Sequence, residues 1–141
     1  MFIKTRLIYF VHGTKYDNAS KKCSGWKNVM LNELGRVQAK NLGKINSNIN
    51  FDIIFTSDLV RTVESADIAF LNVKKIQDKR LREYNYGDLD GESKNLIIYE
   101  EHIDEPFPNG ESLRNVEKRM RCFIEDVLSE YKGKNYWNCC S

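Results

Sequence analysis

His12 stands where an apolar stretch gives way to polar residues. Residues 9–18 read YFVHGTKYDN, so Gly13 follows the histidine directly and Asn18 ends the polar part. An imidazole at the end of a strand can be a nucleophile or a structural hydrogen-bonding group. Gly13 would let the backbone approach a ligand closely, and Asn18 would offer an amide donor, although Asn18 alone would equally suit a turn. This segment is therefore a candidate for binding and attacking an anionic group.

Arg61 is the second candidate for anion binding. It lies in TSDLVRTVESADI, residues 56–68, about one turn into an expected helix. The free amides at a helix N-terminus favour an anion, and a guanidinium can hold two phosphate oxygens at once. On its own, Arg61 would be interpreted as part of a solvated helix face. Together with His12, Gly13 and Asn18, it predicts a phosphate pocket.

Glu83 is the candidate proton donor. It lies in LREYNYGDLDG, residues 81–91, where glycines fix the loop and Tyr84 and Tyr86 could shield a carboxyl group from water. A desolvated carboxyl group near other anions holds its proton to higher pH, as a general acid must. The alternative is an exposed loop glutamate. For Glu111, in PNGESL, we prefer the interpretation of an acidic residue in the first turn of a helix.

Short apolar runs predict the strands that position these residues. They cover residues 6–11 (RLIYFV), 52–56 and 73–77, and the last residues, NYWNCCS, begin like a further strand. The first run suits a buried strand. In a parallel sheet, ligands bind beyond the carboxyl ends of the strands. His12 and Ser57 each follow a strand, so we expect the His12 loop and the helix that carries Arg61 to face the same crevice.

Three helices are predicted between and after these strands. Asn32 can cap a helix whose Leu34, Val37, Leu42 and Ile45 share one side and cover the sheet. Ser57 and Asp58 can provide a cap and an acidic first turn for a helix that runs to about Phe70. A long amphipathic helix is expected from Ser112 to Tyr131, with Gly133 as its stop signal. Residues 81–91 predict an ordered loop, followed by one helical turn within 93–101 and a break at Pro106 and Pro108.

Strands alternating with helices predict an α/β fold. We expect a three-layer sandwich with a mainly parallel central sheet and helices on both faces. A chain of 141 residues is enough for one ordinary domain, residues 1–141.

Composition excludes several kinds of partner. The net charge is +2 without a polybasic stripe, which argues against nucleic acid and anionic membranes. No apolar run reaches the roughly 18 residues of a spanning helix, and no leader is evident, so we expect a cytoplasmic protein. The four cysteines form no CxxC pair, which favours reduced thiols and no metal. The expected partner is a small phosphorylated molecule.

Five segments resemble, in order, the signature blocks of the histidine phosphatase superfamily, the phosphoglycerate mutase-like proteins. They are VHG followed by Asn18, LNELGRVQAKNLG at 31–43, TSDLVRTVESADI at 56–68, LREYNYGDLDG at 81–91, and FPNGES at 107–112. The resemblance spans nearly the whole chain. It implies an α/β sandwich, a catalytic histidine that forms a phosphohistidine, and no metal or other cofactor. By position, His12 matches the nucleophile, Arg61 the phosphate-binding arginine, Asn18 a polar phosphate ligand and Glu83 the proton donor.

The chain departs from the family pattern in its first block. The family has R-H-G followed by E-T or Q-T, whereas Val11 stands in place of the arginine and Thr14 and Lys15 follow the glycine. Lys15 could supply a charge, but an ammonium group does not reproduce a planar bidentate donor. By analogy with the loss of one preorganised oxyanion donor, turnover could fall on the order of a hundredfold.

The second departure is at the C-terminus. The family continues with an apolar strand and a Ser-His-Gly block, whose histidine is a second phosphate-pocket imidazole. Here the chain reads YWNCC and ends at Ser141, and His102 does not match that position. We therefore expect a domain that is incomplete at its C-terminus.

The preferred hypothesis is a phosphomonoester hydrolase that acts through a phosphohistidine on a small phosphorylated metabolite. A phosphoglycerate mutase is less favoured, because a short chain has little room for the segments that hold a phosphoglycerate. A phospho-ligand binding protein without turnover is the alternative, which Val11 and the missing histidine favour. A third hypothesis is thiol redox or metal chemistry at Cys139 and Cys140, and its only support is that the two cysteines are adjacent in the sequence. Neither the particular substrate nor the oligomeric state is indicated.

Overall fold

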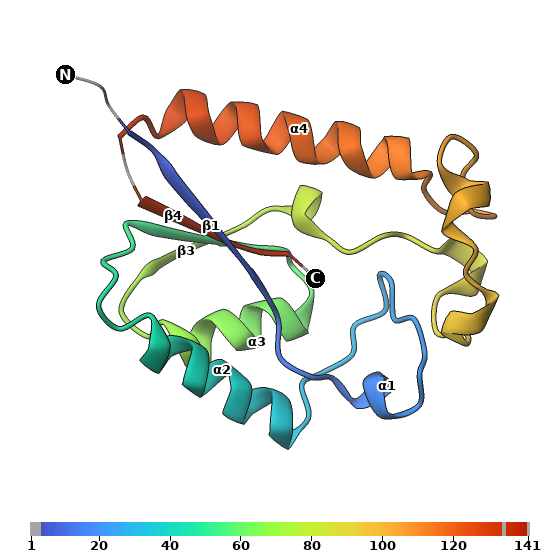
Figure 1. Cartoon of the computed structure of the whole chain (residues 1–141), viewed down its shortest axis with the longest axis horizontal. Helices are drawn as coiled ribbons and strands as arrows, with labels where there is room; N and C mark the ends of the chain where they lie inside the picture. Colours follow the sequence, from blue (N-terminus) through green and yellow to red (C-terminus); the bar gives the residue numbers. More distant parts are fainter. Residues whose placement is uncertain (1–3, 134, 141) are drawn as a thin grey trace.

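The protein forms a parallel four-stranded sheet. A computed structural model describes residues 4–133 and 135–140. The strands are β1 (Arg6–Val11), β2 (Ile53–Thr56), β3 (Lys74–Gln77) and β4 (Asn135–Cys140), and their order in the sheet is β1-β4-β2-β3. All three pairings are parallel. The predicted strands are confirmed, and β4, the last strand of the chain, lies between β1 and β2 (Figure 1).

Helices cover both faces of this sheet, which confirms the predicted three-layer α/β sandwich. Helix α4 (Leu113–Glu130) lies on one face, and α2 (Glu33–Ile45) and α3 (Val60–Ala69) lie on the other (Figure 1). The core under α4 consists of Ile53, Phe55, Leu81, Phe123 and Val127. The opposite core consists of Phe51, Ile54, Ala66 and Phe70. Alternate residues of β2 point to opposite sides, so one strand supplies both cores.

The prediction of a buried first strand is wrong. Leu7, Tyr9 and Val11 are exposed, whereas Ile8 and Phe10 pack against the core on the α2 and α3 side. The physical reason is the position of β1 at the edge of the described sheet, where α4 covers its outward face only in part. β1 is therefore half-buried: from Leu7 to Val11, its side chains alternate between exposed and partly buried positions.

The predicted buried face of α2 is wrong at three of its four positions. Leu34, Val37 and Ile45 are exposed, whereas Leu42 packs against the core beside the buried positions Gly35 and Ala39. Small residues allow the backbone of α2 to approach its neighbours closely, so the packing face is the one with the least side-chain volume. The predicted cap is confirmed, because the Asn32 side chain accepts a hydrogen bond from Gly35 N.

Helix α3 begins later than predicted and without the predicted caps. Its N-cap is Leu59, whose side chain forms no capping hydrogen bond, and Val60 N donates instead to Asn28 Oδ1 at 2.8 Å. The Ser57 hydroxyl is instead bonded to the Thr62 hydroxyl at 2.8 Å. Asp58 forms a bidentate pair with Arg82, with both N–O distances 2.6 Å. Asp58 thus serves a tertiary contact, which a local capping rule does not foresee, whereas Ser57 bonds to a side chain in the first turn of α3.

The segment between β3 and α4 is an ordered loop with short 3₁₀ turns. These are Lys79–Leu81, Gly87–Leu89, Lys94–Leu96 and Tyr99–His102, so two turns replace the single one expected within 93–101. Tyr86 and Phe107 of this loop form a small core together with Cys23 from the segment before α2. A further short helix, α1 (Tyr16–Ala19), lies in the segment after His12, where no helix was predicted.

The long C-terminal helix agrees with its prediction in extent. Ser112 is its N-cap and forms a capping box with Asn115, and Glu130 is its last residue. Cys23 and Cys122 form no disulfide, whereas the side chains of Cys139 and Cys140 lie outside what the structure describes. Among the described residues, no helix combines the length and the hydropathy that crossing a membrane requires.

Candidate active site

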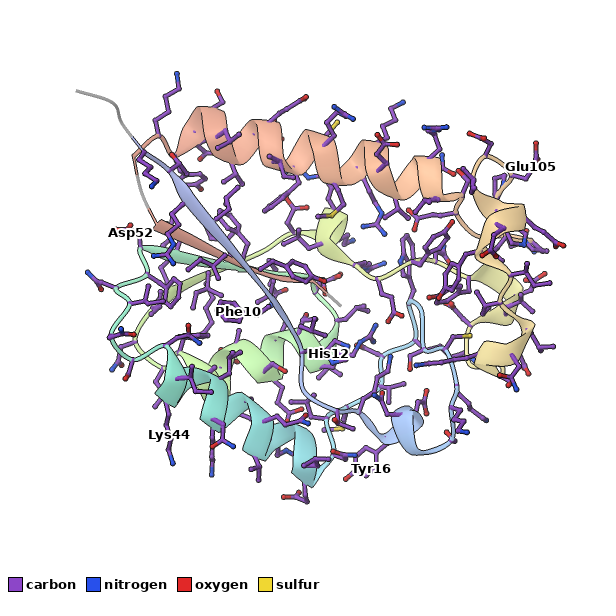
Figure 2. All side chains as sticks on the ribbon, in the orientation of Figure 1. Phe10, His12, Tyr16, Lys44, Asp52 and Glu105 are labelled. Atoms are coloured by element: carbon purple, nitrogen blue, oxygen red, sulfur yellow. The ribbon has the colours of Figure 1, made fainter. Side chains whose placement is uncertain are left out.

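His12 lies at the end of β1, where the chain leaves the sheet toward α1 (Figure 2). Its Nδ1 is 2.5 Å from the carbonyl oxygen of Gly13. A carbonyl oxygen only accepts, so Nδ1 carries the proton and Nε2 keeps its lone pair. Burial is the main cause that lowers the pKa of His12 from 6.5 to about 4. The imidazole is therefore neutral at neutral pH and has a free nitrogen, as a nucleophile requires.

The charges around His12 reinforce this neutral state. Arg61 and Lys15 each lower the pKa of His12, whereas the hydrogen bond to Gly13 and the charge of Glu83 raise it. The charges of Arg61, Lys15 and Glu83, three candidate site residues from the sequence, therefore all affect the pKa of this imidazole. A group of two cations and one carboxylate keeps one net positive charge beside the ring, which suits an incoming anion.

Gly13 anchors the histidine to the helices on its side of the sheet. Its N–H donates to the Ser65 hydroxyl at 3.1 Å, and this hydroxyl donates to the carbonyl oxygen of Arg61 at 2.8 Å. A Cβ atom at Gly13 would overlap the carbonyl group of Gly35 in α2. Sequence analysis missed Ser65. Its spacing of four residues from Arg61, on the same face of a helix, was the available signal.

Arg61 is completely buried, which excludes its interpretation as part of a solvated helix face. Its guanidinium donates to Gly25 O at 2.8 Å, to Lys27 O at 2.9 Å and to Glu83 Oε2 at 2.9 Å. Among the described residues, its buried Nε has no hydrogen-bond partner. A buried N–H without a partner is costly, so an anion that accepted this bond would be favoured.

Lys15 lies beside the same carboxylate. It is buried, with a relative exposure of 5%, and its Nζ is 3.5 Å from Glu83 Oε2. Burial lowers the pKa of Lys15, and the charge of Glu83 acts against this shift. Two cations therefore share one oxygen of Glu83. The structure also excludes the alternative of Glu83 as an exposed loop residue, because its side chain is 22% exposed and forms both ion pairs.

Asn18 lies in α1 and lines a hollow of about 360 Å³ beside His12. Gly13, Gln38 and Ser65 line the same hollow, whereas Arg61, Lys15 and Glu83 do not. The predicted pocket therefore has two parts, an open part with Asn18 and a buried charged part with Arg61. His12 lines the first part and interacts electrostatically with the second.

The interpretation of Glu111 as a first-turn acid is wrong. Glu111 precedes Ser112, the N-cap of α4, and therefore lies outside the helix. Its carboxylate forms an ion pair with Arg119, with an N–O distance of 2.9 Å, and also accepts from Asn85 N at 3.0 Å. A buried guanidinium from the second turn of the helix competes for this carboxylate more strongly than the helix dipole does.

Comparison with protein families and known proteins finds relatives of this chain. The model of the histidine phosphatase superfamily (branch 1) matches residues 8–141. The 2,3-bisphosphoglycerate-dependent phosphoglycerate mutase of Nitrobacter winogradskyi is 32% identical over 142 residues, which cover 87% of this chain and 69% of that protein. The protein of the same name from Bifidobacterium longum is 36% identical over 109 residues, which cover 72% of this chain and 44% of that protein.

Solved structures share the fold. Bacillus stearothermophilus YhfR superposes with a TM-score of 0.87 at 27% identity, over 98% of this chain and 74% of that one. The structure titled Mycobacterial hydrolase 1 has a TM-score of 0.87 at 23% identity, over 96% of this chain and 74% of that one. At the lower identity, the likeness concerns the fold alone.

Proposed function

Since the chain belongs to the histidine phosphatase superfamily, we propose that it hydrolyses a small phosphate monoester through a phosphohistidine at His12. The observation that carries this proposal is the neutral His12 imidazole with a free Nε2, next to the buried cations Arg61 and Lys15. A reaction that begins with attack by nitrogen on phosphorus needs both features.

In the proposed first step, Nε2 of His12 attacks the phosphorus atom, and the bond to the ester oxygen breaks. The Glu83 carboxylate takes a proton from the monoanionic phosphate ester and passes it to the leaving oxygen. In the second step, water attacks the phosphohistidine and gives one proton to Glu83, which passes it to the departing inorganic phosphate. Arg61 and Lys15 stabilise the charge on the phosphoryl oxygens, and Nε of Arg61 has no acceptor among the described residues that would compete with them.

The amide and hydroxyl groups of the hollow would hold the rest of the substrate. Asn18, Gln38 and Thr14 line it, and Gln38 Oε1 accepts hydrogen bonds from the Thr14 amide and hydroxyl groups at 2.8 and 2.9 Å. This contact fixes the side chain of Gln38 and leaves its amino group able to donate. A hollow of about 360 Å³ suits a small metabolite rather than a folded protein.

A phosphoglycerate mutase activity is the second candidate, because the curated relatives at 32% and 36% identity have that name. The first step would be the same, and a substrate hydroxyl would replace water in the second. A binding protein without turnover is the third candidate, because Val11 occupies the position of the family's arginine.

The experiment that tests these candidates measures phosphate release from p-nitrophenyl phosphate and from a set of small phosphorylated metabolites. His12→Ala is the control, and acid-quenched enzyme is examined for a phosphoryl group on His12. Release that depends on His12 supports the hydrolase, and release that survives His12→Ala contradicts it. Interconversion of phosphoglycerates without net phosphate release would favour the mutase. Binding of phosphate without either reaction would favour the third candidate.

A further inference from the structure

The backbone carbonyl group of Glu83 is held from two directions. Trp26 Nε1 donates to this oxygen at 2.8 Å, and Arg119 Nη2 donates to it at 3.0 Å. Trp26 comes from the segment before α2, whereas Arg119 comes from α4 on the opposite side of the sheet. Both bonds act on the residue whose carboxylate contacts Arg61 and Lys15.

Arg119 is itself fixed. Its Nε is 2.9 Å from Glu111 Oε1, its Nη2 is 3.2 Å from Glu111 Oε2, and its Nη1 donates to Arg80 O at 2.5 Å. The side chains of Arg119 and Glu111 are only 14% and 15% exposed. The planar guanidinium thus bonds to the loop before Glu83 and to Glu83 itself. Through Glu111, it also reaches Asn85 N.

Other arginines of α4 differ from Arg119 in this respect. Arg114 and Arg121 are 64% and 66% exposed, and both pair with Glu117 on the helix surface. Such exposed pairs contribute little to stability. Arg114 also pairs with Asp104, farther along the loop. Of these three arginines, Arg119 is the one that bonds to Glu83 itself.

We propose that Arg119 is a positioning residue for the reaction. Together with Trp26, it holds the Glu83 backbone so that the carboxylate stays within hydrogen-bond distance of Arg61. This inference rests on the proposed function, because it assigns Arg119 a role through Glu83. A displacement of about 1 Å in a catalytic group can lower turnover by up to about a hundredfold, so loss of one of the two bonds should be measurable.

The kinetic test compares Arg119→Ala with Arg121→Ala, which removes the same charge from the same helix. We expect Arg119→Ala to lower kcat for p-nitrophenyl phosphate about tenfold or more, with KM changed less than about threefold. Arg121→Ala should leave both unchanged. Arg119→Lys should lower kcat to an intermediate value, because one ammonium group cannot bond to Arg80 O, Glu83 O and Glu111 with the same geometry.

A double-substitution experiment separates positioning from a general effect on the fold. In a Glu83→Gln background, Arg119→Ala should lower kcat less than about twofold further, because the acid that it positions is already absent. An equal loss in both backgrounds would overturn the proposal. Circular dichroism and thermal unfolding establish that each variant is folded.

A readout that does not depend on activity keeps this inference separate from the proposed function. We expect Arg119→Ala to shift the Trp26 indole N–H resonance in an ¹⁵N-labelled sample, since both side chains bond to one carbonyl oxygen. Trp26→Phe assigns that resonance, and Arg121→Ala should leave it in place. If turnover does not depend on His12, the proposed function fails and the resonance still decides whether Arg119 holds Glu83. An unshifted resonance in Arg119→Ala overturns the inference.

Discussion

Gly13 and Gly35 meet backbone to backbone where the loop after β1 passes the first turn of α2. A Cβ atom on Gly13 would overlap the carbonyl group of Gly35, and a Cβ atom on Gly35 would overlap the carbonyl oxygen of Thr14. The carbonyl oxygen of Gly13 also accepts the hydrogen bond from His12 Nδ1. The close approach of these two glycines therefore helps to fix the orientation of the His12 ring.

Gly35→Ala tests this close approach, because it should lower the free energy of unfolding rather than raise it. Helix propensity alone predicts a gain of about 0.5–1 kcal/mol when alanine replaces glycine within a helix. Overlap with the Thr14 carbonyl group predicts a loss of about 1–3 kcal/mol instead, together with lower activity. Urea denaturation measures the free energy of unfolding. Asn41→Ala is the control, an exposed position of α2 where a small gain is expected. A gain of stability in Gly35→Ala would contradict the role assigned to this contact.

Val11→Arg should raise the activity of the proposed hydrolase. Val11 is 62% exposed at the end of β1 and lines the hollow beside His12, so an arginine can be accommodated there without overpacking. It would restore a guanidinium next to the phosphoryl group, and we expect kcat/KM to rise about tenfold or more. Steady-state kinetics with p-nitrophenyl phosphate measures the change. Leu7→Arg adds the same charge to the same face of the strand and should give no increase. Equal effects of both substitutions would argue against a specific role for this position.

The stability of the protein should decrease as the pH falls from about 6.5 to about 4. The pKa of His12 is lowered from 6.5 to about 4 in the folded state, chiefly by burial. Above pH 7 both states are neutral at this residue, so it contributes nothing there. Between the two pKa values, the unfolded chain takes up a proton that the folded protein does not, and the free energy of unfolding falls by up to about 3 kcal/mol.

His12→Gln isolates this contribution. Urea denaturation of both proteins at pH 7 and pH 4.5 gives the free energies of unfolding. The decrease on acidification should be smaller in His12→Gln, whereas the carboxylates contribute equally to both proteins. Identical pH dependence would show that His12 titrates normally in the folded state.

The elements that could be predicted are those whose signals are local. The bounds predicted for β1 agree with the structure, and Asn32 and Ser112 cap the helices that they were expected to cap. An apolar stretch that forms a strand, or a residue that caps a helix, is determined by neighbours within about four positions, so both can be recognised from the sequence alone. Where a polar residue has a distant partner, the local rule fails. Asp58 pairs with Arg82, and Glu111 pairs with Arg119, and neither lies in the first turn of the helix that follows it.

The exposure of side chains was predicted less well than the elements themselves. Leu34 and Val37 share an apolar spacing that predicts a buried face, but the packed face of α2 has Gly35 and Ala39. Periodicity tells which residues lie on one side of a helix, whereas the space available between neighbouring elements decides which side is buried. In the same way, the burial of β1 depends on what covers it rather than on its own composition.

The sequence by itself determined the order of strands and helices, the family of the fold and the identity of the candidate residues His12, Arg61 and Glu83. Only the tertiary structure decided that β4 separates β1 from β2, and that Lys15 and Arg61 share one carboxylate oxygen of Glu83. These partners lie 68 and 22 residues apart along the chain. Contacts of that separation depend on how the sheet and its helices pack together, because no local preference of the backbone specifies them.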